Sequence, residues 1–409
     1  MRILLVTPMP PQPQAPGAIP LVLNAELVGL LPRHNITLVT IAGLEPGEQE
    51  AVNRLIAAGL EVHVVRRTQL QGFHIWQRRW RLASTWLGGK YPWRTVWFWD
   101  PDVQRILDRL LEEQSFELVI VEDNAMGIYT YRTTTPLLFT EHEVRRARLI
   151  DTAGLRHRDF LHWFLKESDW SRWPRYQRSV WRKFDRIQAF TQRDAEAIGV
   201  MAPEVAKRVR VNPFGVEMPA SFDSEAQEQN TILFVGNFTH APNVDSALWL
   251  GQDIMPLLRE YRPGVHLQLI GIYPPPEVKA LASHDIEVTG PVPQIEPYFA
   301  RAALVVAPIR IGGGMRMKVL QAMAFGKAVV TTTRGADGLA VDGLQPPLVT
   351  ADDSTGYTQA VARLLADENA RRELGRQARA YVTVYFSSQA YANRIEAIYA
   401  EMQAERRSA

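Results

Sequence analysis

Residues 311–333 read IGGGMRMKVLQAMAFGKAVVTTT, and they follow the short apolar run ALVVAP at residues 303–308. This order predicts a buried strand, a glycine turn, a helix that begins near Met315 and ends at Gly326, and a second buried strand over residues 328–332. A strand, a helix and another strand in succession form the repeating unit of a parallel sheet. The fold class expected from these residues is therefore α/β.

The glycine turn is also the first candidate site. Gly312, Gly313 and Gly314 would let the backbone approach a ligand closely, and the helix behind them presents unpaired N–H groups at its positive end. Arg316 and Lys318 add positive charge. This pattern favours a cradle for a diphosphate. Taken alone, the turn fits close packing of a helix on a strand equally well, because the chain has neither a GxxxxGK[ST] nor a GxGxxG motif.

Length and composition narrow the class of protein. The chain has 409 residues, which predicts two domains of roughly 200 residues each. Its 46% hydrophobic and 22% charged residues are typical of a soluble globular protein. The absence of cysteine excludes disulfides, thiolate metal sites and cysteine nucleophiles. The apolar run at the N-terminus is too short for a signal peptide, and no apolar segment reaches about 18 residues, so we expect a cytoplasmic protein that does not cross a membrane.

Strands and helices alternate in both halves of the chain, which predicts two doubly wound parallel sheets. The first half has predicted strands at 2–7, 36–41, 61–65, 117–122, 136–140, 187–191 and 209–212, with helices at 20–31 and 47–58. The second half has predicted strands at 231–235, 266–270 and 286–289, with helices at 245–258, 277–282, 355–366, 368–385 and 388–407.

The polar segment SFDSEAQEQN at residues 221–230 is interpreted as a linker. We therefore predict a first domain over 1–220, a second over 221–387, and a helix over 388–409 that packs back on the first domain. Two consecutive α/β sheets predict a ligand cleft between them, at the carboxyl ends of the strands.

Charge and tryptophan are unevenly distributed. Residues 145–193 hold thirteen Arg/Lys against five Asp/Glu, and ten of the eleven tryptophans lie within residues 76–181. Basic and aromatic residues together are typical of membrane-interface helices, so contact with a membrane surface and a lipid-linked acceptor would fit. The alternative is that the tryptophans fill the first core while the arginines pair with acids, phosphates or water. A nucleic-acid partner is not favoured, because no recognised binding module accompanies the charge.

Three segments of the second half occur in a familiar order: FVGNFTHAPNVDSALWL, LQLIGIYPPPEV, and IEVTGPVPQIEPYFARAALVVAPIRIGGGMRMKVLQAMAFGKAVVTT. Together they closely resemble glycosyltransferase family 4. The resemblance is specific over residues 231–338 and looser in the first half, where Gly17 and the segment TEHEVRRAR are consistent with it. It implies a GT-B fold of two Rossmann-like domains, with the acceptor on the first, a nucleotide-sugar donor on the second, and retention of anomeric configuration.

The resemblance implies a donor site at the strand ends of the second half. Gly236 would let the donor phosphates approach, and Gly271 would lie beside the nucleotide. Gly290 and Val292 belong to a loop expected to hold the base through backbone groups. The other implied residues are His240, Gly312, Gly313, Gly314 and Gln321 on the donor side and Gly17 on the acceptor side.

Arg316 and Lys318 are implied to neutralise the departing diphosphate. We therefore expect no cofactor and no required metal, since oriented cations can carry this charge. Two features depart from the family pattern. The Glu-x7-Glu pair is replaced by Gly313 and Gln321, and the segment after Gly236 lacks the family's usual Arg and Lys. Gln321 can still accept a hydrogen bond from a ribose hydroxyl, but without the help of charge.

His142, in the TEHE segment, matches a histidine that the family places near the donor sugar. We predict that His142, Arg316 and Lys318 are the catalytic residues. His142 would act by hydrogen bonding to the sugar. The other interpretation is an ordinary loop histidine held by Glu141 or Glu143.

The resemblance thus implies a retaining glycosyltransferase that moves a sugar from a nucleotide-diphosphate sugar to an acceptor hydroxyl. The acceptor would be a carbohydrate, a lipid-linked sugar or a small molecule, as in polysaccharide or glycolipid assembly. Two alternatives stay open. One is a catalytically weak nucleotide-sugar-binding protein, suggested by Gly313 and Gln321, and the other is a nucleotide-sugar epimerase.

Overall fold

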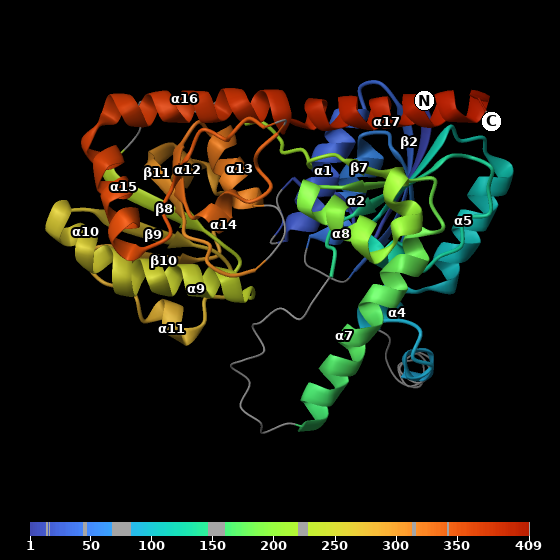
Figure 1. The fold of residues 1–409 in the computed structure, drawn as a ribbon, viewed down its shortest axis with the longest axis horizontal. Coiled ribbons are helices and arrows are strands. Elements are labelled where there is room, and N and C mark those ends of the chain that lie inside the picture. Colours follow the sequence, from blue (N-terminus) through green and yellow to red (C-terminus); the bar gives the residue numbers. More distant parts are fainter. Residues whose placement is uncertain are drawn as a thin grey trace. The chain divides into compact units, whose positions relative to one another are not determined.

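The computed structural model describes residues 1–13, 15, 17–43, 47–67, 83–145, 160–219, 228–312, 316–341 and 343–408. The chain forms two compact units (Figure 1). The first comprises Ile19–Pro213 with Met1–Ala15 and Ala392–Ala409, and the second comprises Phe214–Tyr391 with Pro16–Ala18. Each unit contains one parallel sheet with helices, so the α/β prediction is confirmed.

The first sheet has seven parallel strands in the order β3-β2-β1-β4-β5-β6-β7. They are β1 Arg2–Thr7, β2 Asn35–Ala42, β3 Glu61–Arg66, β4 Leu118–Glu122, β5 Leu137–Glu141, β6 Arg186–Ala189 and β7 Val209–Val211. The central strands are buried along their length, because helices cover both faces of a parallel sheet. The strand order reverses between β1 and β4, which is where ligands bind in open α/β sheets.

Helices of the first unit carry aromatic residues that the sequence concentrates there, some buried and some exposed. They are α1 Ala18–Leu30, α2 Glu48–Ala57, α4 Trp93–Phe98, α5 Pro101–Glu113, α6 Asp123–Met126, α7 Phe160–Trp181 and α8 Gln192–Met201, followed by a 3-10 helix over Pro203–Arg208. Trp173 and Trp181 of α7 are buried in the core, whereas Trp93 and Trp97 of α4 are exposed. The core interpretation is therefore right for Trp173 and Trp181 and wrong for Trp93 and Trp97.

The C-terminal helix α17, Ser388–Ser408, contributes residues 392–408 to the first unit. Ile395, Ile398 and Met402 on this helix are buried. Its polar side chains contact other residues of the first unit: Glu396 pairs with Arg33 at 2.9 Å, and Arg394 donates to Asn212 at 2.7 Å. Apolar burial and charged contacts both attach this segment to the first unit.

The second sheet has six parallel strands in the order β10-β9-β8-β11-β12-β13. They are β8 Glu228–Val235, β9 His266–Ile270, β10 Ile286–Gly290, β11 Ala302–Ala307, β12 Ala328–Thr331 and β13 Val349–Thr350. The linker prediction is wrong for residues 228–230, because β8 begins at Glu228, which pairs with Ala302 of β11. Residues 221–227 of that prediction lie outside the described residues.

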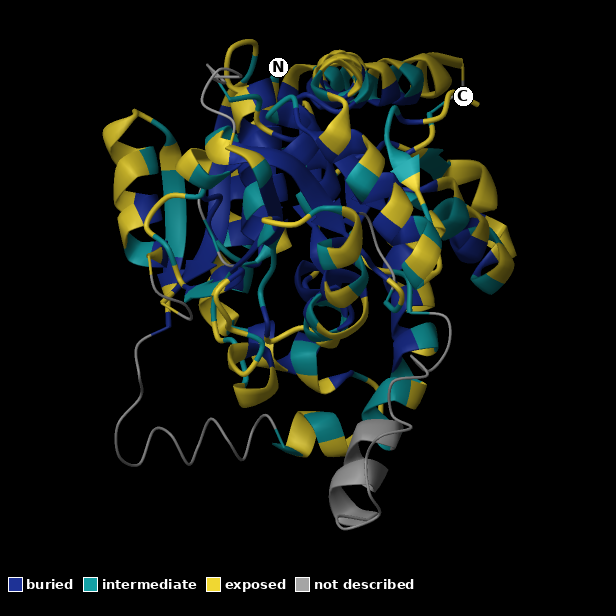
Figure 2. Ribbon diagram, turned by 90° about the vertical axis from the view of Figure 1, so that its left-hand side faces the viewer, coloured by how far each residue is buried: buried dark blue, intermediate teal, exposed yellow. Residues whose placement is uncertain are grey.

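The helices of the second unit are α9 Ala241–Trp249, α10 Met255–Tyr261, α11 Pro276–Lys279, α12 Glu296–Arg301, α13 Met317–Ala324, α14 Thr333–Ala336, α15 Ser354–Ala366 and α16 Glu368–Tyr385. A π-helical turn over Leu250–Ile254 separates α9 from α10, where the sequence predicts one continuous helix. Figure 2 shows the buried residues concentrated in the strands and the exposed ones on the outer faces of helices. Within the described residues, no helix has both the length and the apolar character needed to cross a bilayer.

Candidate functional site

The predicted donor glycines of the second unit lie at the carboxyl ends of neighbouring strands. Gly236 follows β8, Gly271 follows β9, and Gly290 ends β10. A Cβ atom on Gly271 would lie 1.6 Å from the carbonyl oxygen of Gly236, so the two strand ends approach as only glycine allows. Gly271 N also donates to Gly290 O at 3.3 Å. Backbone contacts therefore bring these three predicted residues together.

The glycine turn is described as far as Gly312, and the predictions for Gly313 and Gly314 lie outside the described residues. Gly312 has a φ of +89°, and a Cβ atom there would lie 2.8 Å from Cγ of Pro242. Two guanidinium groups donate to its carbonyl oxygen, Arg316 at 3.0 Å and Arg334 at 3.3 Å. Close contact with Pro242 thus restricts the backbone at Gly312, and hydrogen bonds from Arg316 and Arg334 fix its carbonyl group.

Lys318 lies in the first turn of α13, behind the glycine turn. Its ammonium group is 4.5 Å from the centre of the Phe234 ring and donates to Oδ1 of Asn243. Asn243 in turn donates to the carbonyl of Asn237 at 2.6 Å. Burial, and then the charge of Arg316, lower the pKa of Lys318 to about 7. The segment after Gly236, which lacks cations of its own, is therefore in direct contact with a lysine from α13.

The remaining predicted donor residues are less enclosed. His240 is exposed at the residue before α9, and Val292 is partly exposed in the loop after β10. Gln321 is partly buried, about one turn beyond Lys318 in α13. Gly17, predicted on the acceptor side, comes immediately before α1.

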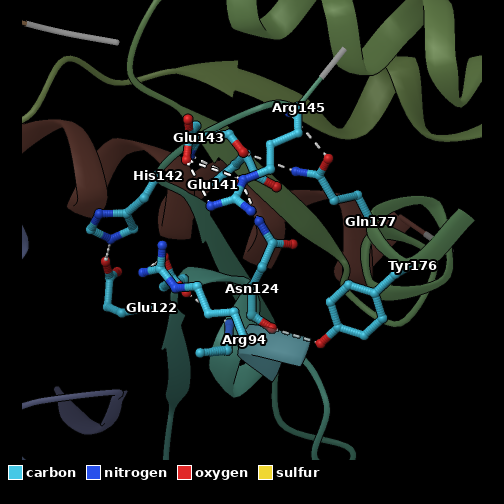
Figure 3. A network of polar contacts seen from close by, with 11 residues as sticks. Arg94, Glu122, Asn124, Glu141, His142, Glu143, Arg145, Tyr176 and Gln177 are labelled. Carbon is cyan, nitrogen blue, oxygen red and sulfur yellow. Dashed lines mark hydrogen bonds and ion pairs between the residues drawn. The ribbon is translucent and has the colours of Figure 1, made fainter. Parts of the chain in front are cut away.

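The first unit holds His142 directly after β5 (Figure 3). Its Nε2 atom lies 2.6 Å from Oε2 of Glu122, the fully buried last residue of β4. The hydrogen-bonding partner is thus on the neighbouring strand and is neither Glu141 nor Glu143. Burial alone would lower the pKa of His142, but the hydrogen bond and charge of Glu122, with further charges nearby, raise it above the ordinary histidine value.

Three more carboxyl groups surround this pair and differ in charge. Burial, and then the charge of Glu122, raise the pKa of Glu26 on α1 well above its usual range. Burial also raises the pKa of Glu141 to about 8, although Trp181 and Asn124 donate hydrogen bonds to it. Asp123 behaves oppositely. Burial favours its neutral form, but the charges of Arg94 and His142 outweigh it and lower its pKa.

Two arginines and the amide of Gln177, which accepts from Arg145 N at 3.2 Å, also belong to this cluster (Figure 3). Arg94 lies 3.6 Å from Asp123, and Arg145 donates to Glu143 at 3.0 Å while its guanidinium lies 3.9 Å from the Trp173 ring centre. The sequence prediction missed Glu122, Asp123, Arg94 and Arg145. One signal was present for Glu122, because it ends an apolar strand of a parallel sheet, where polar side chains gather.

Within the part of the chain that the structure describes, no three His, Asp or Glu side chains are grouped so that they could hold a metal ion.

Comparison with known proteins finds a family match within the second unit. Residues 229–367 match the family model described as glycosyl transferases group 1. A lipopolysaccharide core biosynthesis mannosyltransferase of Rhizobium leguminosarum bv. viciae is 34% identical over 132 residues, which are 32% of this chain and 37% of that protein. An exopolysaccharide phosphotransferase of Streptomyces coelicolor is 26% identical over 191 residues, 45% of this chain and 19% of the relative. The chain therefore spans well under two thirds of either relative.

Solved structures resemble the whole chain in fold. Sucrose-phosphate synthase of Thermosynechococcus elongatus has a TM-score of 0.63 at 15% identity and covers 99% of both chains. HepE of Anabaena, solved with UDP and glucose, has a TM-score of 0.63 at 16% identity, covering 99% of this chain and 100% of that one. TarM has a TM-score of 0.66 at 8% identity, covering 97% and 98%. The fold is GT-B, as the sequence predicts.

We predict that Gly312→Ala destabilises the second unit more than Gly290→Ala does. Both glycines have positive φ, so either alanine costs about 1–2 kcal/mol in strain. An added Cβ meets Pro242 at Gly312 but nothing within 4 Å at Gly290. Urea unfolding of the two variants measures the difference. Equal losses would mean that the Pro242 contact relaxes without cost and does not fix the turn.

Proposed function

We propose that this protein is a glycosyltransferase that moves a sugar from a nucleotide-diphosphate sugar to an acceptor hydroxyl. The observation that carries the proposal is the meeting of Gly236, Gly271 and the Gly312 turn with Arg316 and Lys318 at one edge of the second sheet. Backbone that can approach a ligand, a helix N-terminus and two cations are the groups a diphosphate needs. The family match covers these same residues.

The proposed donor and product class follow from the relatives. One relative is a lipopolysaccharide core biosynthesis mannosyltransferase, and the other is an exopolysaccharide phosphotransferase. HepE was solved with UDP and glucose, and TarM of S. aureus was solved with UDP and carbohydrate ligands. We propose that the donor is a nucleoside-diphosphate hexose and that the transfer retains anomeric configuration, as in glycosyltransferase family 4. The proposed acceptor is a carbohydrate or a lipid-linked sugar in polysaccharide or glycolipid assembly.

In the proposed reaction, the bond from the anomeric carbon to the diphosphate breaks while the acceptor oxygen bonds to that carbon on the same face. Negative charge grows on the departing diphosphate, and Arg316, Lys318 and the N-terminus of α13 would stabilise it. These groups can carry the charge without a metal. The departing phosphate oxygen would take the acceptor proton, so retention needs no separate base. His142 would hydrogen bond to a hydroxyl of the transferred sugar.

A screen for donor and turnover tests this function. UDP-, GDP- and ADP-sugars are each added to the protein, and a true donor should raise the unfolding temperature, because a ligand at 100 times its Kd stabilises by about 2.7 kcal/mol. With carbohydrate and lipid-linked acceptors present, the same donor should release its nucleoside diphosphate and form a new glycosidic bond. Stabilisation without release would instead favour a binding protein, as the glutamine at Gln321 suggests. An isomerised nucleotide sugar would favour an epimerase.

A second prediction concerns proton uptake by Lys318. Its pKa of about 7 leaves the side chain largely neutral at about pH 8 in the free protein. A bound diphosphate favours the charged form, so binding should take up a proton, and affinity should fall as the pH rises above about 7. Calorimetry of UDP binding at about pH 8, in two buffers of different ionisation enthalpy, measures this uptake.

The matched control is Lys318→Arg, because a guanidinium stays charged and takes up no proton. The difference in binding enthalpy between the two buffers should therefore disappear in this variant. A wild-type protein whose binding enthalpy is the same in both buffers would contradict the placement of Lys318 beside the diphosphate.

We also propose that the first unit contacts an anionic membrane surface, where a lipid-linked acceptor would be found. Leu87, Trp93 and Trp97 are 71%, 42% and 41% exposed, and Lys90 between them is exposed as well. Tryptophans are favoured at the membrane interface, and lysine is attracted to anionic lipid.

Sedimentation with phosphatidylglycerol vesicles tests this surface. The double variant Leu87→Ser, Trp93→Ser should sediment less than wild type, and binding should be weaker with phosphatidylcholine or high salt. Val200→Ser is the control, because Val200 is 81% exposed on a different helix, α8. An equal loss in the control, or no wild-type binding, would refute the contact.

A further inference from the structure

A row of buried polar side chains crosses the carboxyl ends of the first sheet. Thr7 is in register with Thr40, Glu122 with Thr140, and Thr140 with Gln188. These five residues, and Asn212 just after β7, have no exposed surface. Strands of a buried parallel sheet are usually apolar, and a buried polar group is costly unless it is hydrogen bonded. Apolar packing therefore does not account for these polar side chains, and their burial depends on hydrogen bonds between them.

One part of the row is a continuous chain of hydrogen bonds. Arg394 Nε donates to Asn212 Oδ1 at 2.7 Å, and Asn212 Nδ2 donates to Gln188 Oε1 at 2.8 Å. Gln188 Nε2 donates to Thr140 Oγ1 at 2.5 Å, and the Thr140 hydroxyl donates to Oε1 of Glu122. The chain thus runs from a cation on α17, across β7, β6 and β5, to a carboxylate on β4.

The direction of this chain is set by its first member. A guanidinium group has donors and no acceptor, so Asn212 must turn its oxygen to Arg394 and its amide nitrogen to Gln188. The same argument then orients Gln188 and the hydroxyl of Thr140. Donors aligned in one direction polarise one another and strengthen each bond.

Glu122 is therefore an acceptor at both oxygens. Its Oε1 atom accepts from Thr140, and its Oε2 atom lies 2.6 Å from Nε2 of His142. With the Glu122 carboxyl group charged, it offers no hydrogen, and the histidine then donates from Nε2. Nδ1 is then the ring nitrogen that can gain and lose a proton.

We propose that Glu122, Thr140, Gln188 and Asn212 are positioning residues that keep Nε2 of His142 protonated, so that Nδ1 is the atom offered to the substrate. In the neutral ring, Nδ1 can accept a hydrogen bond from a sugar hydroxyl. This inference rests on the proposed function only for the identity of that ligand. Among the described residues, the charged groups that act on the His142 ring are Glu122, Asp123 and Glu141. Glu26 on α1 faces Glu122, and the charges of Arg94 and Arg145 act on Asp123.

Glu122→Gln tests the claim most directly. The Thr140 hydroxyl can still donate to the introduced amide oxygen, so the introduced NH2 group would face Nε2 of His142. Nε2 must then accept, and the proton should move to Nδ1. NMR of protein with 15N-labelled histidine rings, followed through a pH titration, distinguishes the two tautomers. In the wild type, Nε2 should stay protonated at every pH while Nδ1 titrates. In the neutral ring of the variant, Nδ1 should carry the proton and Nε2 should not.

The kinetic readout separates positioning from donor binding. In Glu122→Gln, kcat should fall about 10-fold or more, while KM for the donor should change by less than about 3-fold, as for other residues that orient a reacting group. If the wild-type protein turns over no donor, the proposed function fails, yet the ring measurement still decides the positioning claim because it needs no substrate.

A matched pair of threonines controls for damage to the fold. Thr140→Val breaks the chain between Gln188 and Glu122, whereas Thr40→Val removes a hydroxyl that accepts from Thr7 at 2.9 Å in the same row. Both threonines are fully buried on strands of one sheet. Only Thr140→Val should shift the His142 ring signals and lower kcat. Equal shifts in the two variants, or a wild-type ring protonated on Nδ1 alone, would overturn the proposal.

Discussion

Parallel strands all end at the same edge of their sheet, and this constraint arranges the polar groups of both units. An apolar strand buried on two faces leaves its carboxyl end as the place where polar or glycine residues can occur without opening the core. In the first unit these ends carry Glu122, Thr140 and Gln188, and in the second they carry Gly236, Gly271 and Gly290. The same geometry thus produces a charged cluster in one unit and a close backbone approach in the other.

In the first unit, the central energetic problem is a set of buried carboxyl groups. Isolated charges cannot remain in such a place, so each group is either neutral or paired. Glu26 and Glu141 have raised pKa values, whereas Asp123 is held charged by Arg94 and His142. Hydrogen bonds from neighbouring strands reach Glu122. The histidine is therefore held by a network whose members come from several strands and helices.

In the second unit, sterics and charge act together. The approach of Gly271 to the Gly236 carbonyl leaves no room for a side chain, and Pro242 restricts Gly312 in a similar way. Lys318 lies in α13, Arg316 directly precedes α13, and Arg334 lies in α14, so the three follow β11 and β12. They provide cations beside a strand end that has none of its own. Charge that the segment after β8 lacks is thus supplied from the adjacent part of the sheet.

Local sequence was enough to predict the α/β class and most strands. The strands at 2–7 and 266–270 have the predicted bounds, because apolar runs and turn residues are local signals. The partner of His142 and its link to Arg394 could not be predicted in this way. Glu122 lies 20 residues from His142, and Arg394 lies 182 residues from Asn212. Such contacts exist only once strand order and register are formed, so tertiary structure alone determined which buried groups meet.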